Sequence, residues 1–269
     1  MKYGAGKIAH LLGVSIETVR NYEKLGLISP ARNDQNFYRE YDPIDLNILR
    51  RVRTYTSCGL SVKQSADVIL HGSIDDLAAL FGETSEALSE KMRYDIHLLI
   101  FLKQRQSHLS RISAMENMCC IENSPAMYGI QYREGLRFVK DENVEMLFRD
   151  WSEKRPFADA MIKFTKDNFI DDGLEYSHGL CIEEQFADFC GIAANEHVVY
   201  YPRRKCLYTF VNEVFEPKVS VANTSVHIAK RYLKEMGLCM TGDPYGRVVH
   251  SSKAYGEYCH FMEIWVPIE

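Results

Sequence analysis

The segment between Gly13 and Gly26 contains many hydroxyl, amide and charged side chains, and its pattern predicts a short helix. Such a helix can enter the major groove of a DNA duplex, with its N-terminal half against the base edges. Contacts to phosphates fix its register and carry little sequence information. We expect base contacts from Ser15, Glu17, Thr18 and Asn21, and phosphate contacts from Arg20, Tyr22 and Lys24. We also expect Arg39, flanked by Tyr38 and Tyr41, to straddle the DNA backbone beside the groove.

A second candidate group lies near the C-terminus, where a carboxylate stands between two aromatic residues. Phe261, Glu263 and Trp265 share one face of an expected strand, because side chains alternate with a two-residue period. A negative charge between aromatic rings suits an organic cation, through charge and cation–π attraction. We therefore expect Glu263 to lie in a pocket. The alternative is a position at a rim, where Glu263 would be paired with a lysine or arginine.

Cys119 and Cys120 are the candidates for a metal site. Adjacent cysteines cannot complete a tetrahedral site alone, and no His or Cys follows within the next fifty residues. We expect both to be small, half-buried residues at the end of a helix, and we expect neither a metal nor a cofactor. The eight cysteines lack the spacing of a disulfide framework and no secretory signal is apparent, so free thiols are expected.

The charge distribution is that of a basic head on an acidic protein. Residues 1–70 contain ten Lys and Arg against seven Asp and Glu, a net charge of +3, and the remainder contains 22 against 30, a net charge of −8. Only one end of the chain is therefore suited to an anionic partner. Because no apolar run is long enough to span a membrane, we expect a cytoplasmic protein with no membrane partner.

Three segments must position these residues, and we expect them to cover 1–72, 73–118 and 119–269. In the first segment the pattern predicts helices over 6–12 and 16–25, a hairpin over 31–41, a helix from Pro43 and another over 62–70. Ser15 caps the second helix and Gly26 ends it. Two short helices joined by a glycine-containing turn predict an all-α, winged helix-turn-helix head.

The second segment predicts one helix of more than 30 residues, since it contains neither Pro nor Gly after Gly82. Its apolar seam has alternating spacings of three and four, with Asp95 and Gln106 as polar interruptions, and consists of Leu88, Met92, Leu99, Leu102 and Leu109. Such a seam favours a partner helix, so we expect a homodimer through an antiparallel coiled coil. A long helix packed within its own chain is the alternative.

The third segment predicts an α+β domain built from two successive β-α-β-β units. The first unit has expected strands over 126–132, 159–165 and 176–183 and a helix over 144–154. The second has strands over 205–212, 245–250 and 258–267 and a helix over 221–236.

Residues 6–30, GKIAHLLGVSIETVRNYEKLGLISP, resemble the N-terminus of MerR-family transcription regulators. Residues 38–42, YREYD, resemble that family's wing, and the likeness extends over about residues 3–71, with Asn21 where an aromatic is usual. The resemblance implies a dimer on double-stranded promoter DNA, at a pseudo-palindromic site between the two hexamers that RNA polymerase recognises. It further implies that an effector makes the dimer distort the DNA and so activates transcription.

The third segment resembles GyrI-like effector-binding domains at residues 179–183 (GLCIE), 202–206 (PRRKC) and 262–268 (MEIWVPI). This resemblance implies an aromatic-lined groove between the two halves that holds a lipophilic, cationic or planar small molecule, with Glu263 as the buried glutamate of the groove. Further candidates for the lining, of which at least half are expected to be core, are Tyr128, Trp151, Tyr176, Phe186, Tyr208 and Phe210.

Three alternatives for the tail remain open beside the small-molecule sensor: a protein-binding, a metal-sensing or a hydrolytic domain on the same DNA-binding head. No Ser-His-Asp or Cys-His arrangement is legible in the spacing, and a lone carboxylate is weak evidence for turnover. We therefore expect that the protein is not an enzyme.

Overall fold

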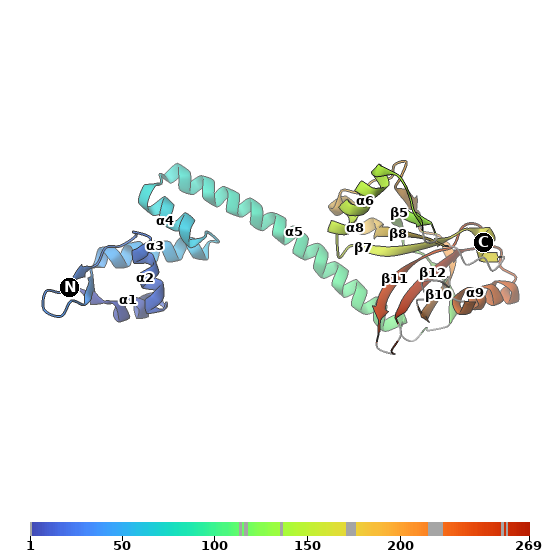
Figure 1. Cartoon of the computed structure of the whole chain (residues 1–269), viewed down its shortest axis with the longest axis horizontal. Helices are drawn as coiled ribbons and strands as arrows, with labels where there is room; N and C mark the ends of the chain where they lie inside the picture. Colours follow the sequence, from blue (N-terminus) through green and yellow to red (C-terminus); the bar gives the residue numbers. More distant parts are fainter. Residues whose placement is uncertain are drawn as a thin grey trace. The chain divides into compact units, whose positions relative to one another are not determined.

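The computed structural model describes residues 2–112, 115, 118–134, 137–170, 176–214, 223–253, 256 and 258–269. It consists of two compact units, Met1–Ile96 and His97–Glu269 (Figure 1). Helix α5 (Ile74–Ile112) contributes to both units. None of the described helices is long and apolar enough to cross a membrane.

The first unit contains the predicted helices and hairpin. Its elements are β1 (Tyr3–Gly4), α1 (Ala5–Leu12), α2 (Ile16–Lys24), β2 (Ala31–Arg32), β3 (Arg39–Tyr41), α3 (Pro43–Ser57) and α4 (Val62–His71). The head is not entirely helical as expected, because β1 adds a third strand to the hairpin in the order β1-β3-β2.

Short polar side chains begin the helices of this unit. The hydroxyl of Ser15 accepts a hydrogen bond from the Thr18 amide at 3.0 Å, and Asp42 and Ser61 form capping boxes at the starts of α3 and α4. Each helix then buries one apolar stripe, and Ile8, Val19 and Leu49 meet in the core of the head. The buried stripe of α2 leaves its polar stripe in solvent.

Helix α5 has 39 residues, which confirms the expectation of one long helix. Its predicted seam is exposed in the single chain, since Leu88 and Met92 are both 56% exposed and Leu99, Leu102 and Leu109 are also exposed. A second stripe with the same alternating spacing lies on another face of its C-terminal half: Leu98, Phe101, Arg105, His108 and Ile112. This second stripe packs on the tail domain.

The tail contains all eight predicted elements and five more. Its elements are β4 (Cys119–Asn123), β5 (Met127–Glu134), β6 (Arg137–Phe138), α6 (Glu142–Glu153), β7 (Ala158–Phe164), α7 (Lys166–Ile170), β8 (Tyr176–Glu183), α8 (Glu184–Cys190), β9 (Val199–Tyr201), β10 (Lys205–Val214), α9 (Asn223–Met236), β11 (Tyr245–Ser252) and β12 (Cys259–Pro267). Strands β4, β6 and β9 and helices α7 and α8 were not expected. Residues 221–222 of the expected second helix, and 113–114 and 116–117 of the expected long helix, lie outside the described residues.

One antiparallel sheet contains all nine described strands of the tail, in the order β4-β10-β12-β11-β7-β8-β5-β6, with β9 also paired to β5. The order repeats within it. In each β-α-β-β half, the third strand lies between the first and the second, giving β5-β8-β7 and β10-β12-β11. The halves meet where β7 pairs with β11.

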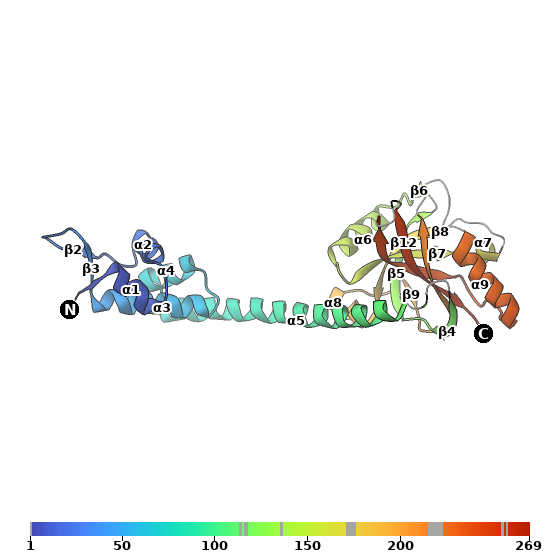
Figure 2. The ribbon, with the colours of Figure 1, turned by 90° about the horizontal axis from the view of Figure 1, so that it is seen from below.

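The two faces of this sheet are covered differently (Figure 2). Helices α6 and α9 pack on one face, where Trp151 of α6 contacts Ile130 and Leu233 of α9 contacts Leu207. The opposite face carries Met161, Tyr208 and Trp265, and Ile112 from the end of α5 packs there. The second stripe of α5 therefore lies over the face that bears Glu263.

The two adjacent cysteines were expected at the end of a helix, and this expectation was wrong. Cys119 and Cys120 lie in edge strand β4, where Cys120 is paired with Tyr208 of β10. They face opposite sides of the sheet, since Cys119 joins the core beneath α9 and Cys120 the core beneath α5. Pairing with β10 takes this segment into the sheet, a long-range contact that its own short pattern does not reveal.

Candidate functional site

Helix α2 presents most of its predicted DNA-contacting residues to solvent. Glu17, Arg20, Asn21 and Lys24 are exposed, and Thr18 is half-buried. Ser15 is exposed as well, but its hydroxyl caps the helix and also contacts the Thr18 hydroxyl at 2.9 Å. The exposed stripe has the charge and hydrogen-bonding groups that a recognition helix requires.

Two tyrosines predicted to contact DNA are core residues instead. Tyr22 is 3% exposed and Tyr41 is not exposed at all, and both pack in the core of the head. Tyr22 falls on the apolar stripe of α2, and Tyr41 ends the central strand of the small sheet. Both residues therefore support the position of α2. The expectations that Tyr22 contacts a phosphate and that Tyr41 lies beside Arg39 against the DNA were wrong, because both side chains are buried.

Arg39 joins the wing to α2. Its Nε donates to both carboxylate oxygens of Glu23, at 3.0 and 2.9 Å, and this hydrogen bond raises the pKa of Arg39. Tyr38 beside it is 74% exposed. Direct contact of Arg39 and Tyr38 with a DNA backbone remains a prediction, whereas the link between Arg39 and Glu23 fixes the hairpin against α2.

The Tyr41 hydroxyl is buried and has no hydrogen-bond partner. Replacing Tyr41 with phenylalanine removes this unsatisfied group, so we expect the free energy of unfolding of the head to rise by up to about 1 kcal/mol. We also expect unchanged DNA affinity. Circular dichroism during urea unfolding and anisotropy of labelled DNA measure the two quantities, and weaker DNA binding by Y41F would restore a contact role to Tyr41.

The tail contains a cavity of about 790 Å³ between α5 and the sheet. One wall is the second stripe of α5 with its neighbours, including Phe101, Gln104, Arg105, His108 and Arg111. The other walls come from residues 122–126, from 183–186, and from Arg203, Arg247 and Trp265. All of these residues belong to the second unit, so the cavity is a property of the tail and the last turns of α5.

Glu263 lies directly behind this lining and is completely buried. Arg247 Nε donates to its Oε2 at 2.7 Å, Tyr208 Oη donates to its Oε1 at 3.1 Å, and His108 Nε2 contacts the same Oε1. Burial alone would raise the pKa of Glu263, but Arg247 and His108 outweigh it and hold that pKa at about 2. Glu263 is therefore an ionised carboxylate, and it is paired with an arginine behind the cavity wall rather than at a rim.

Arg247 is the centre of the charged group. It is 5% exposed, and its Nη1 contacts Glu183 and lies 3.6 Å from Asp159 Oδ2. Burial opposes its charge, yet Glu263, Glu183 and Asp159 raise the pKa of Arg247 well above its ordinary value. The register explains the geometry, because Arg247 of β11 is directly opposite Glu263 of β12.

Close approach of β11 and β12 depends on Gly246. A Cβ at this position would lie 2.0 Å from the backbone oxygen of Glu263. Any side chain there would push the two strands apart. Gly246 thus permits the spacing that pairs Arg247 with Glu263.

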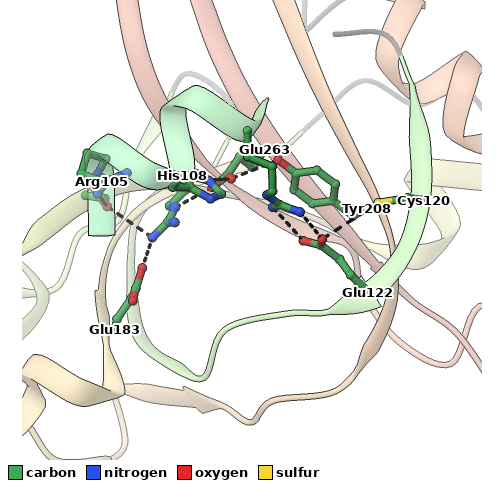
Figure 3. Close-up of polar contacts among 10 residues, drawn as sticks. Arg105, His108, Cys120, Glu122, Glu183, Tyr208 and Glu263 are labelled. Carbon is green, nitrogen blue, oxygen red and sulfur yellow. Dashed lines mark hydrogen bonds and ion pairs between the residues drawn. The ribbon is translucent and has the colours of Figure 1, made fainter. Parts of the chain in front are cut away.

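Helix α5 contributes three cationic or titratable side chains to the cavity (Figure 3). Arg105 contacts Asp159, and His108 contacts Glu263. Arg111 donates to both oxygens of Glu122, at 2.6 and 3.3 Å, and its guanidinium lies 5.3 Å from the centre of the Tyr208 ring. The helix is therefore held on the sheet through charge as well as through apolar packing.

The structure separates the nine predicted ligand residues into groups. Trp265 and Phe186 line the cavity, and Glu263 and Tyr208 lie directly behind its lining. Phe261 shares the face of Glu263, as the alternation predicted, but stacks with Phe210 at 6.3 Å outside the lining.

Three predicted lining residues belong to other cores. Tyr128 and Trp151 pack in the cluster beneath α6, and Tyr176 packs against Phe164. Tyr128 and Tyr176 lie on the face of the sheet opposite Glu263, while Trp151 fixes α6 there. These three candidates are core residues, as was expected of at least half of the six, because side-chain alternation directs the two strand residues away from the cavity.

Five residues of the charged group were not predicted. Asp159, Glu183 and Arg247 are charged residues next to apolar residues in strands β7, β8 and β11, which is the signal that could have identified them. Arg105 and His108 are three residues apart on α5 and in register with Phe101 and Ile112, so they interrupt a second apolar stripe.

Within the described part of the chain, no group of three or more His, Cys, Asp or Glu side chains is arranged to hold a metal ion. Burial raises the pKa of the Cys119 and Cys120 thiols, which favours their protonated forms over the thiolate that a metal requires. Cys120 Sγ lies 3.9 Å from Glu122 Oε2, and that carboxylate is already paired with Arg111.

Comparison with known proteins bears mainly on the head. Residues 3–71 match the family described as "MerR HTH family regulatory protein". The chain is 28% identical over 95 residues to the HTH-type transcriptional activator mta of Bacillus subtilis, covering 35% of this chain and 37% of that protein. It is 38% identical over 85 residues to the heavy metal-dependent transcription regulator 2 of Rhizobium meliloti, covering 32% and 52%. The matches thus span between about a third and a half of these relatives.

Among solved structures, the chain is similar to the one titled "Cryo-EM structure of EcmrR-DNA complex in EcmrR-RPo". The likeness covers 99% of each chain at 14% sequence identity, with a TM-score of 0.39. This score is too low for the likeness to support an inference about function.

Proposed function

Because residues 3–71 form a MerR-family helix-turn-helix domain, we propose that the protein is a transcription regulator rather than an enzyme. In this proposal a homodimer binds a pseudo-palindromic promoter that RNA polymerase also occupies. A lipophilic, planar or cationic small molecule then fills the cavity of the tail, and the dimer activates transcription by distorting the DNA. The exposed polar stripe of α2, positioned by the helix-turn-helix, is the observation that carries the proposal.

The DNA-binding part is supported by the electrostatics of the head. Arg20 and Lys24 extend from α2 into solvent, and residues 1–70 carry a net charge of +3. Affinity for duplex DNA grows with the number of phosphates neutralised, so a second copy doubles the modest contribution of one head. Two heads related by a two-fold axis require two half-sites.

The dimer is supported by the exposed seam of α5. Its large apolar side chains, Leu88 and Met92 among them, are exposed in the single chain, whereas a stable soluble helix buries such a stripe against a partner. The spacing of the seam alternates between three and four, which supports a coiled coil of two copies of α5. We propose that the two helices run antiparallel.

The effector is supported by the cavity over the sheet. Its volume of about 790 Å³ lies within the ordinary range for small-molecule sites, and Phe101, Phe186 and Trp265 provide apolar walls beside charged groups. Planar aromatic molecules suit such walls. The pairing of Glu263 means that a cation must share this carboxylate with Arg247 or replace another of its partners.

The test begins with selection of bound fragments from random duplex DNA by the full-length chain, followed by footprinting. We expect two half-sites related by a dyad, and analytical ultracentrifugation should give a dimer. Transcription from the selected site with purified RNA polymerase is then measured with and without lipophilic compounds. A single asymmetric site would contradict the dimeric mode, and failure to enrich any DNA would overturn the proposal.

Ligand binding by the full-length chain distinguishes the alternative functions of the tail. Thermal unfolding of the full-length chain is followed with planar aromatics, organic cations and divalent metals, since a ligand of the folded state raises the midpoint. A response to metals alone would favour metal sensing, and loss of the intact compound by mass would favour hydrolysis. We expect a response to organic compounds that are recovered unchanged.

A further inference from the structure

The charged side chains in and directly behind the cavity wall, where Arg247 and Glu263 are buried and Arg105, Asp159 and Glu183 are half-buried, do not balance without a titratable group. Three carboxylates, those of Asp159, Glu183 and Glu263, face two guanidinium groups, those of Arg105 and Arg247. Arg111 and Glu122 form a separate, closed pair nearer the surface. The cluster therefore has a formal deficit of one positive charge, and His108, which contacts Glu263, is the titratable side chain in a position to supply it.

His108 differs from the other cations in two respects. Arginine stays charged in proteins, whereas histidine is the side chain whose charge ordinarily changes between pH 5 and 8. Arg247 is 5% exposed and is also held by Glu183 and Asp159, whereas the side chain of His108 on α5 is 21% exposed to the cavity. Among the three donors to Glu263, His108 is the one that can be exchanged.

We propose that His108 is an internal cation that a singly charged organic cation replaces at Glu263, with release of the histidine's proton. The inference rests on the proposed function, because it assigns the chemistry of the ligand to the cavity described there. Replacement of one positive charge by another keeps the buried cluster neutral, which avoids the cost of an uncompensated buried carboxylate. A neutral ligand offers no such exchange and leaves His108 in place.

The walls around His108 suit a planar cation. Trp265 and Phe186 line the same cavity, and the Arg247 guanidinium already lies 5.6 Å from the centre of the Trp265 ring, which shows that a delocalised cation is accommodated there. The Arg111 guanidinium likewise lies 5.3 Å from the centre of the Tyr208 ring. A planar aromatic cation can therefore occupy the place of the imidazole with its charge toward Glu263.

The charged and titratable groups around His108 come from every neighbouring element. They are Arg105 and Arg111 of α5, Cys120 and Glu122 of β4, Asp159 of β7, Cys181 and Glu183 of β8, Glu184 of α8, Arg203 before β10, Tyr208 of β10, Arg247 of β11 and Glu263 of β12. The pKa of Glu263 is about 2, and burial raises the pKa values of Cys181 and Tyr208 well above neutrality. These three groups keep their protonation states between pH 5.5 and 8.5.

The experiment compares two planar three-ring probes that differ in charge, N-methylacridinium and the neutral N-methylacridone. Their affinities for the full-length protein are measured by calorimetry from pH 5.5 to 8.5, in two buffers of different ionisation enthalpy. We expect the affinity for the cation to rise about tenfold over this range, because linkage gives a factor of about ten for each pH unit through which binding releases one proton. Close to one proton should be released per cation at pH 5.5 and none at pH 8.5, and N-methylacridone should show neither effect.

The variant H108Q tests the assignment, because glutamine retains a donor to Glu263 without the charge. Its affinity for the cation should be independent of pH and, at pH 5.5, about tenfold above that of the wild type. The matched control is H97Q on the same helix, where His97 stacks on Phe189 at 4.2 Å, and it should keep the wild-type pH dependence.

The outcomes distinguish this inference from the proposed function. Cation binding without proton release in the wild type, or an unchanged pH dependence in H108Q, would overturn the inference and leave the small-molecule sensor standing. Absence of binding for both probes, with no response to other planar compounds, would overturn both.

Discussion

Replacement of Arg247 by methionine is expected to lower the free energy of unfolding of the tail by about 3–5 kcal/mol at pH 7. The substitution removes the guanidinium that Glu263 and Glu183 share and leaves carboxylates without that partner in a buried site. Methionine fills a similar volume, so the loss reports charge rather than a void. Both tryptophans of the chain, Trp151 and Trp265, lie in the tail, and their fluorescence during urea unfolding therefore follows this unit alone.

Acid should reduce the difference between R247M and the wild type. The folded-state pKa of Glu263 lies at about 2, below its ordinary value, so its contribution to stability is present above that ordinary value and is lost as the pH falls toward 2. In R247M the carboxylates lose their main counter-charge, and burial then raises their pKa values. As the pH falls, the carboxylates of R247M are therefore protonated before those of the wild type, and their uncompensated charge is removed. We expect the difference in free energy of unfolding between R247M and the wild type to narrow between pH 7 and pH 4.

The matched control is R231M. Arg231 forms an exposed pair with Glu235 at 3.8 Å, and such pairs contribute less than about 1 kcal/mol. Equal losses in R247M and R231M, or a gap that does not change with pH, would contradict the central role of Arg247.

Replacement of Arg20 by alanine is expected to weaken binding of the selected DNA by about 30-fold. A dimer loses one phosphate contact per head, and two contacts of about 1 kcal/mol each give about this factor. Arg20 is exposed on α2, so the stability of the head should not change. Anisotropy of labelled DNA at several KCl concentrations measures the affinity, and its slope against the logarithm of salt should fall by about 2.

Lys234 provides the control for this prediction, because it is an exposed basic residue on α9 of the tail. K234A should bind the DNA like the wild type and keep its salt dependence. An unchanged salt dependence in R20A would show that Arg20 contacts no phosphate, whatever happens to affinity at a single salt concentration.

Local patterns predicted most of the elements. Caps such as Ser15, breakers such as Gly26 and the alternation along β12 are written within a few residues, and the structure confirms the helices and strands that they indicate. The predictions failed where the structure of a segment depends on a partner that is distant in the sequence. Strand β4 depends on pairing with β10, and Tyr41 is buried by helices on either side of it in the sequence.

The candidate site was predictable in part for the same reason. Alternation placed Glu263 and Trp265 on one face, and the structure confirms that placement. Arg247 could be matched with Glu263 only through the register of β11 on β12, and His108 only through the packing of α5 on the sheet. Neither relation is contained in a short window of residues.

The junction between the two halves of the tail, where β7 pairs with β11, has a consequence for how this domain folds during synthesis. Arg247 belongs to the second half, but its partners Asp159 and Glu183 belong to the first, and Arg247 follows Glu183 by 64 residues. During synthesis the first half leaves the ribosome before Arg247 is translated, so that Asp159 can pair with Arg105 but Glu183 still lacks the guanidinium with which it pairs. A half emerging alone therefore cannot complete its charged interior. The domain should fold as one late, cooperative event that awaits the final strands, and such non-local pairing is slow by nature.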